Sequence, residues 1–78
     1  MLEDYKKEIL TTSLEGRKRE VTEYQVNIDN FRLAIAKIGD DLELVEFKKQ
    51  LEELLRTSLY EQRKAQIMLE VIQSQLEN

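Results

Sequence analysis

The chain has 78 residues, a formal net charge of −4, and neither cysteine nor histidine. This length limits it to one small domain over residues 1–78, whose core alone contributes no more than about 3–5 kcal/mol to stability. Disulfide bonds and a structural zinc site, the usual supports, need residues that the sequence lacks. Helix packing and association between chains remain as sources of stability.

The composition also narrows the class of protein. Charged residues make up 36% of the chain, with two glycines and no proline, which is typical of long helices and coiled coils. The net negative charge argues against a dedicated nucleic-acid binder, because such proteins present a basic surface to phosphate. No apolar run reaches the roughly 18 residues that a membrane span requires. Since cysteine is absent, the cytoplasm is the expected location.

The first predicted element is a helix over residues 2–38. Its apolar residues recur at alternating steps of four and three, which predicts a heptad seam of the coiled-coil kind. The seam consists of Leu10, Leu14, Arg17, Val21, Tyr24, Ile28, Phe31, Ile35 and Ile38. Thr12 followed by Glu15 fits a capping box, and Gly16 costs about 1 kcal/mol in a helix interior. These residues leave open a break in the helix at 11–16.

A turn is predicted at residues 39–40. Gly39 suits the left-handed position that ends a helix, and Lys37 before it faces the negative end of the helix dipole. Asp40 suits the N-cap of a second helix, and Glu43 completes a capping box. Because the link is so short, the two helices are expected to be antiparallel neighbours.

The second predicted helix covers residues 41–77 and has a matching seam. Its members are Leu44, Lys48, Leu51, Leu55, Ser58, Gln62, Ala65, Leu69, Ile72 and Leu76. Folding the chain at Gly39 places Arg17 in one layer with Gln62, with Ser58 one layer on. A polar seam layer costs stability but can fix register. We therefore expect an all-α antiparallel helical hairpin, coiled-coil-like, with Arg17, Ser58 and Gln62 as its polar register layer.

The second helix is apolar beyond its seam. Positions beside the seam are normally charged when only two helices pack, and apolar ones widen the stripe to what a three- or four-helix bundle needs. The flanking residues are Val45 and Leu59 on one side and Phe47, Leu54 and Met68 on the other. We expect them to form an oligomer interface, most simply in a symmetric dimer that closes a four-helix bundle.

A further group of apolar residues falls outside the main seam. It comprises Val26 and Leu33 on the first helix, Tyr60, Ile67 and Val71 on the second, and Tyr5 and Ile9 near the N-terminus. Single exposed apolar residues are ordinary on any protein surface. The other interpretation is a site for a partner protein that packs a helix against them, for which tyrosine is a favoured anchor.

The residue types that usually carry out catalysis are missing from the sequence. Histidine, the commonest general base at neutral pH, is absent, and so is a thiol nucleophile. The two glycines lie too far apart to form a phosphate-binding loop. The sequence therefore predicts no enzyme, no metal site and no cofactor.

The expected function is a non-enzymatic protein–protein interaction, as a small adaptor, assembly chaperone or regulatory subunit that also associates with itself. The expected shape resembles small helical-hairpin chaperones and adaptors, a likeness of architecture that does not carry function. One alternative is a structural subunit of a larger assembly, such as a phage or secretion particle. A second is a nucleic-acid-binding helical protein, which the net charge disfavours. Its candidate residues are Lys6, Lys7, Arg17, Lys18, Arg19, Arg63 and Lys64.

Overall fold

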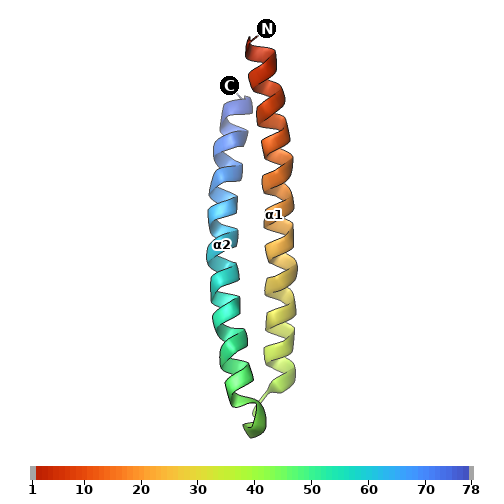
Figure 1. The fold of residues 1–78 in the computed structure, drawn as a ribbon, viewed down its shortest axis with the longest axis vertical. Coiled ribbons are helices and arrows are strands. Elements are labelled where there is room, and N and C mark those ends of the chain that lie inside the picture. The colour runs from red at the N-terminus through yellow and green to blue at the C-terminus, as the bar shows by residue number, and fades with distance from the viewer. Residues whose placement is uncertain (1, 78) are drawn as a thin grey trace.

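The computed structural model describes residues 2–77 and contains two long helices joined by a tight turn (Figure 1). Helix α1 covers Leu2–Ile38, a short 3-10 helix, η1, covers Leu42–Leu44, and helix α2 covers Val45–Glu77. No strand occurs within these residues. The all-helical hairpin expected from the sequence is therefore confirmed.

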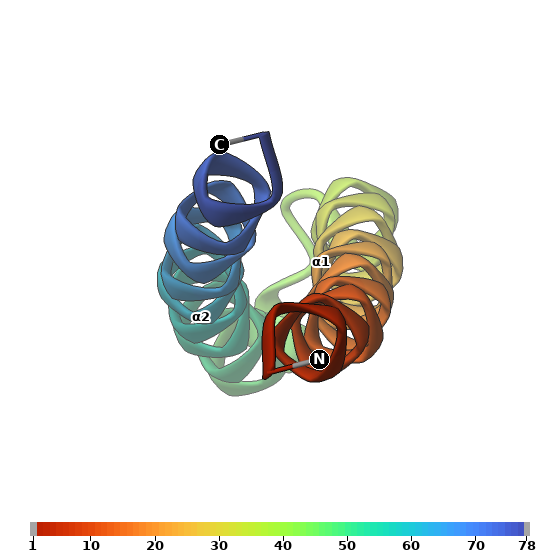
Figure 2. The same cartoon turned by 90° about the horizontal axis from the view of Figure 1, so that it is seen from above.

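The hairpin is a rod with extents of 63 × 15 × 14 Å, and α1 reaches past the end of α2 at the open end, opposite the turn (Figure 1). In the end-on view the two helices wind around each other (Figure 2). A heptad spacing of apolar residues imposes such winding, because it keeps the two seams facing each other along the whole length.

Helix α1 is continuous through residues 11–16, where the sequence had left a break open. Thr12 does not cap a new helix, because its hydroxyl donates a hydrogen bond to the carbonyl oxygen of Glu8 at 3.1 Å. A bond of this kind, one turn back along the chain, is compatible with a helix interior. Gly16 therefore lies in mid-helix, and a Cβ built on it would meet no atom within 4 Å.

The turn ends α1 at the expected glycine but starts the next element one residue later than expected. Gly39 has a φ of +56°, the left-handed conformation that favours glycine. The N-cap is Asp41 and not the expected Asp40: its side chain accepts a hydrogen bond from the Glu43 N–H at 3.0 Å. Asp40 is still in the turn, since the N–H of Asp41 donates back to the carbonyl oxygen of Ile38 at 3.2 Å.

Lys48 fastens α2 to the end of α1. Its ammonium donates a hydrogen bond to the carbonyl oxygen of Gly39 at 2.8 Å. A cation at this point also lies at the negative end of the α1 dipole. The ammonium of this seam lysine therefore bonds to a backbone carbonyl at the end of α1 and does not pack among apolar side chains.

The hydrogen bonds between the two helices do not follow the expected pairing. The side chain of Gln62 donates to the carbonyl oxygen of Val21 at 3.1 Å, whereas the expected partner of Val21 was Ser58. Arg17 bonds to Glu20 on its own helix at 3.0 Å, so the hydrogen bonds of the structure do not join Arg17 to Gln62.

Burial follows the two predicted seams except at Leu44 of η1, which is exposed. The least exposed residues are Ile28 on α1 and Leu51, Ser58, Ala65, Leu69 and Ile72 on α2. The remaining seam residues of α1 are half-buried. Two of the buried α2 residues, Ser58 and Ala65, are small, which lets the helices approach closely. The core is a single line of side chains along the rod.

Two alanine substitutions test the roles of the glycines. We expect Gly16→Ala to raise the free energy of unfolding by about 0.5–1 kcal/mol, because alanine favours the helix and its Cβ meets no neighbouring atom. Gly39→Ala should lower it by about 1–2 kcal/mol, since a residue with a Cβ is strained at a positive φ. Urea unfolding followed by circular dichroism at one protein concentration measures both. A loss of stability in Gly16→Ala would contradict the continuous helix.

Candidate functional site

Large apolar side chains are exposed along the whole rod. They comprise all seven residues expected to bind a partner, all five flanking residues of α2, and Leu42 and Leu44 of η1. Among the predicted residues, Tyr5 is the most exposed at 71%, while Leu59 remains exposed at 39%. The packing of α1 on α2 therefore leaves every one of these side chains in contact with water.

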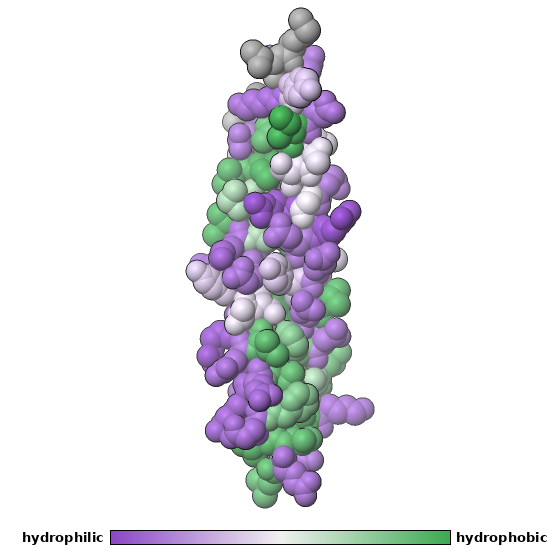
Figure 3. Space-filling model, viewed as in Figure 1, coloured by the Kyte–Doolittle hydropathy of each residue, from purple (hydrophilic) through white to green (hydrophobic). Residues whose placement is uncertain are grey.

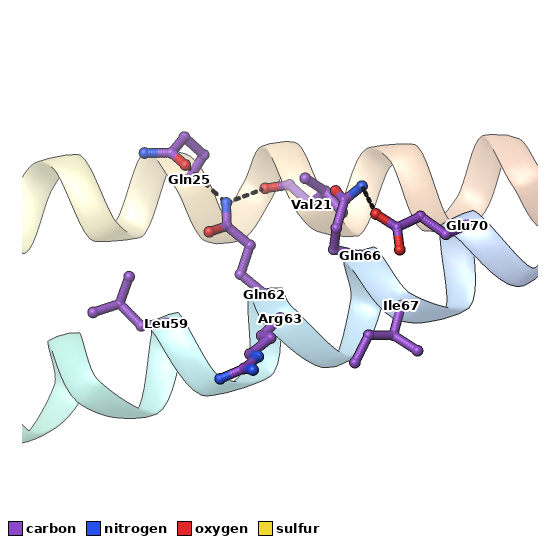
Figure 4. A pocket seen from close by; sticks show the side chains of 8 residues that line it. All are labelled: Val21, Gln25, Leu59, Gln62, Arg63, Gln66, Ile67 and Glu70. Atoms are coloured by element: carbon purple, nitrogen blue, oxygen red, sulfur yellow. Dashed lines mark hydrogen bonds between the residues drawn. The ribbon is translucent and has the colours of Figure 1, made fainter.

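A hollow of about 560 Å³ lies between the helices beside Gln62, and its lining mixes polar side chains with the apolar Val21, Leu59 and Ile67 (Figure 4). The Gln62 side chain crosses from α2 to α1: its Nε2 donates to the carbonyl oxygen of Val21 and, at 2.8 Å, to the side-chain oxygen of Gln25. Further along, Gln66 donates to Glu70 on its own helix at 3.3 Å. We term Gln62 with its two acceptors the amide latch. This side of the hairpin is occupied by polar groups.

The three residues expected to form a polar layer do not all meet. Ser58 is buried and Gln62 half-buried, both at the contact between the helices. Arg17 is half-buried but pairs with Glu20. The interhelical bond made by Gln25 was missed, because Gln25 lies outside the predicted seam.

The other side of α2 carries Phe47, Leu54 and Met68, which we term the apolar flank. Their spacing in multiples of seven places them on one side of the helix. They are exposed at 48%, 50% and 41%, respectively. In the space-filling view, apolar atoms gather along the rod in the half nearest the turn, whereas polar side chains dominate its middle (Figure 3). Phe47 and Leu54 belong to the half nearest the turn.

A second apolar surface lies on the outer face of α2. Leu59, Tyr60 and Ile67 border an open hollow of about 630 Å³, which Arg63 and Lys64 also line. Tyr60 and Ile67 are exposed at 59% and 52%. The Lys64 ammonium lies 5.2 Å from the centre of the Tyr60 ring, within the range of a cation–π contact. We term Tyr60, Arg63, Lys64 and Ile67 the mixed patch.

The remaining expected partner-binding residues form separate surfaces. Val26 and Leu33 lie on the outer face of α1, which points away from the outer face of α2 because the two helices pack through their seams. Tyr5 and Ile9 border a small hollow of about 260 Å³ near the open end. Val71, exposed at 46%, lies one turn beyond the mixed patch on α2.

The cations proposed for a nucleic-acid surface are spread over the hairpin. Lys6 and Lys7 line a hollow at the open end of the rod. Arg17, Lys18 and Lys64 each pair with a glutamate of their own helix. A backbone of phosphates is held by cations that follow one another along a surface. The described residues do not arrange these cations in such a stripe.

Within residues 2–77 no cluster of histidine, cysteine, aspartate or glutamate side chains is arranged to hold a metal ion. Neither described helix has an apolar stretch of the length that a bilayer crossing needs. Comparisons of the chain with protein-family models, with curated proteins and with solved structures find no match. The function has therefore to be inferred from the geometry of the surface.

The amide latch should set the register more than the stability. Gln62→Leu should raise the free energy of unfolding by about 1 kcal/mol, because a polar seam residue costs stability and the freed Gln25 amide is exposed to water. Gln62→Ala should lower it by about 1 kcal/mol, because it leaves space unfilled. Urea unfolding of both variants at one concentration measures the difference. A leucine variant less stable than the alanine variant would mean that the latch itself is a main source of stability.

Proposed function

We propose that the hairpin is a non-enzymatic protein-interaction module. It pairs with a second copy of itself through the apolar flank, closing a four-helix bundle, and presents the mixed patch to another protein. A small adaptor, assembly chaperone or regulatory subunit works in this way. The observation that supports the proposal is the amount of apolar surface that the two helices leave uncovered.

The area of that surface matches what a dimer needs. The single hairpin exposes 6436 Å². A compact monomer of its mass, 9.3 kDa, exposes about 5,000 Å². The excess of about 1,400 Å² comes from the rod shape, because a layer of two helices leaves two broad sides in water. A stable interface buries about 800 Å² on each partner, so covering one broad side would remove more than half of this excess.

The apolar flank is the better of the two broad sides for this contact. Phe47 and Met68 are residue types enriched at the centre of interfaces. On the opposite side, burial would strip water from the amides of Gln62 and Gln25, which would then need further partners. Two copies related by a twofold axis would place the apolar flanks against each other.

The remaining flanking residues fall outside this dimer contact. Leu59 borders the hollow of the mixed patch as well as the hollow of the amide latch. Val45 lies beside the turn, with Gly39 and Lys48 as neighbours. The proposed dimer leaves both exposed, so Leu59 joins the surface offered to another protein.

A structural subunit of a larger assembly is the second candidate. The observation that favours it is the presence of apolar side chains on the outer face of α1, where Leu33 is exposed at 69% and Val26 at 53%. An assembly that surrounds the rod with neighbours would cover these residues too. Such a subunit would associate beyond a dimer when isolated.

We expect light scattering on a sizing column to give twice the chain mass of 9.3 kDa. The double variant Phe47→Ser/Leu54→Ser should elute at the single-chain mass. It should also melt at a lower temperature, because the small core of one hairpin is then its only source of stability. Val26→Ser/Leu33→Ser is the matched control, since it removes two residues of comparable exposure from α1. This control should remain a dimer.

Other measured masses would distinguish the two proposed functions. A wild-type chain that is a folded monomer at all concentrations would refute self-association through the apolar flank. A mass above that of a dimer, lowered by the Val26→Ser/Leu33→Ser substitutions, would favour the structural subunit.

A further inference from the structure

The mixed patch lies in the part of α2 where positive charge is concentrated. The chain as a whole has a net charge of −4, yet residues 56–67 contain Arg56, Arg63 and Lys64 against one carboxylate, that of Glu61. This local excess of positive charge surrounds exposed apolar side chains. A surface that is both apolar and locally basic differs from the apolar flank, which has no cation among its three members.

The helix places these cations beside the apolar residues. Arg56, Tyr60, Arg63 and Ile67 follow one another at steps of four, three and four, so they lie on one face of α2. Arg63 lines both hollows of this region. None of the ion pairs between described residues includes Arg56 or Arg63. Their guanidinium groups are therefore available to carboxylates from outside the chain.

The neighbouring acids compensate much of this charge: Glu52 and Glu53 lie one turn before Arg56 and offset it. Glu61 pairs with Lys64 at 3.3 Å and so reduces the contribution of that lysine. Glu70 lies one turn beyond Ile67, and its carboxylate accepts a hydrogen bond from Gln66 at 3.3 Å. Arg63, which lies between Tyr60 and Ile67 on this face, is the cation best placed to meet a carboxylate from a bound partner.

We propose that the mixed patch binds an amphipathic helix of another protein whose apolar anchors are flanked by glutamate or aspartate. The proposal rests on the interaction module described above and names the chemistry of its second partner. Apolar anchors at helical spacing would cover Tyr60 and Ile67 and fill the hollow between them. Carboxylates beside the anchors would reach Arg63, whose planar guanidinium can bind both oxygens of one carboxylate.

Charge also argues against a second copy of this chain at the patch. A symmetric contact would bring the patches of two copies together and oppose their cations. Like charges facing each other at an interface cost several kcal/mol, whereas opposite charges raise both the rate of association and the selectivity. The patch is therefore suited to a different, acidic partner.

The test is a selection that reports charge preference without knowledge of the partner. A phage-displayed library of helical peptides keeps leucine or phenylalanine at anchor positions of helical spacing and varies the flanking positions among glutamate, lysine and glutamine. Selection on the wild-type chain should enrich glutamate. The synthetic glutamate peptide should bind about tenfold more tightly than its lysine counterpart at low salt. Equal affinities, a preference for lysine, or the absence of any selected peptide would overturn the proposal.

Variants locate the binding surface. Arg63→Glu/Lys64→Glu should reverse the preference from glutamate to lysine, and the milder Arg63→Gln/Lys64→Gln should abolish the preference without adding repulsion. Lys18→Glu/Arg19→Glu is the matched control, because it reverses two adjacent exposed cations on α1. This control variant should prefer glutamate peptides as strongly as the wild type does. Tyr60→Ser/Ile67→Ser should remove binding altogether while helicity and mass stay unchanged.

The outcomes separate this proposal from self-association. A monomeric chain that still selects acidic peptides would refute the dimer and support the docking site. A dimer that selects none would refute the docking site alone. Loss of the dimer mass in Arg63→Glu/Lys64→Glu would reassign the patch to a second copy. Salt-dependent binding of random-sequence DNA that this variant loses, with no peptide selected, would reassign it to nucleic acid.

Discussion

A layer of two helices can bury only one stripe of each helix, and this constraint governs the rest of the molecule. Only five apolar side chains are buried: Ile28 on α1 and Leu51, Ala65, Leu69 and Ile72 on α2. The large apolar side chains away from the seam remain exposed. The stability of the fold and the binding proposed for it therefore have one origin: α2 has more apolar surface than α1 can cover.

The turn decides which residues share the buried stripe. Gly39 ends α1 in the left-handed conformation, Asp41 caps η1, and Lys48 bonds back to the end of α1. These contacts fix how the two helices start alongside each other. Further along, the Gln62 amide bonds to the backbone of Val21 and places polar groups between the helices on that side.

The helices, their antiparallel arrangement and the residues of the seam could be predicted from the sequence, because spacing along a helix fixes which side chains share a face. The bonds of Gln62 to Val21 and Gln25 could not, because they depend on how a long side chain crosses between the helices. The apolar residues of the candidate surfaces could be named for the same reason as the seam. Their division into separate surfaces could not, since it follows from how the two helices pack against each other.

The central claim is that the apolar flank is covered by a second copy of the chain. The sequence has no tryptophan, so one introduced at Phe47 reports on this surface alone. In Phe47→Trp, the emission maximum should be that of an indole ring shielded from water at high protein concentration, and it should shift to longer wavelength on dilution. In Leu33→Trp, on the outer face of α1, the emission maximum should be that of a solvated ring at every concentration. A Phe47→Trp emission that is solvated at every concentration would contradict the account.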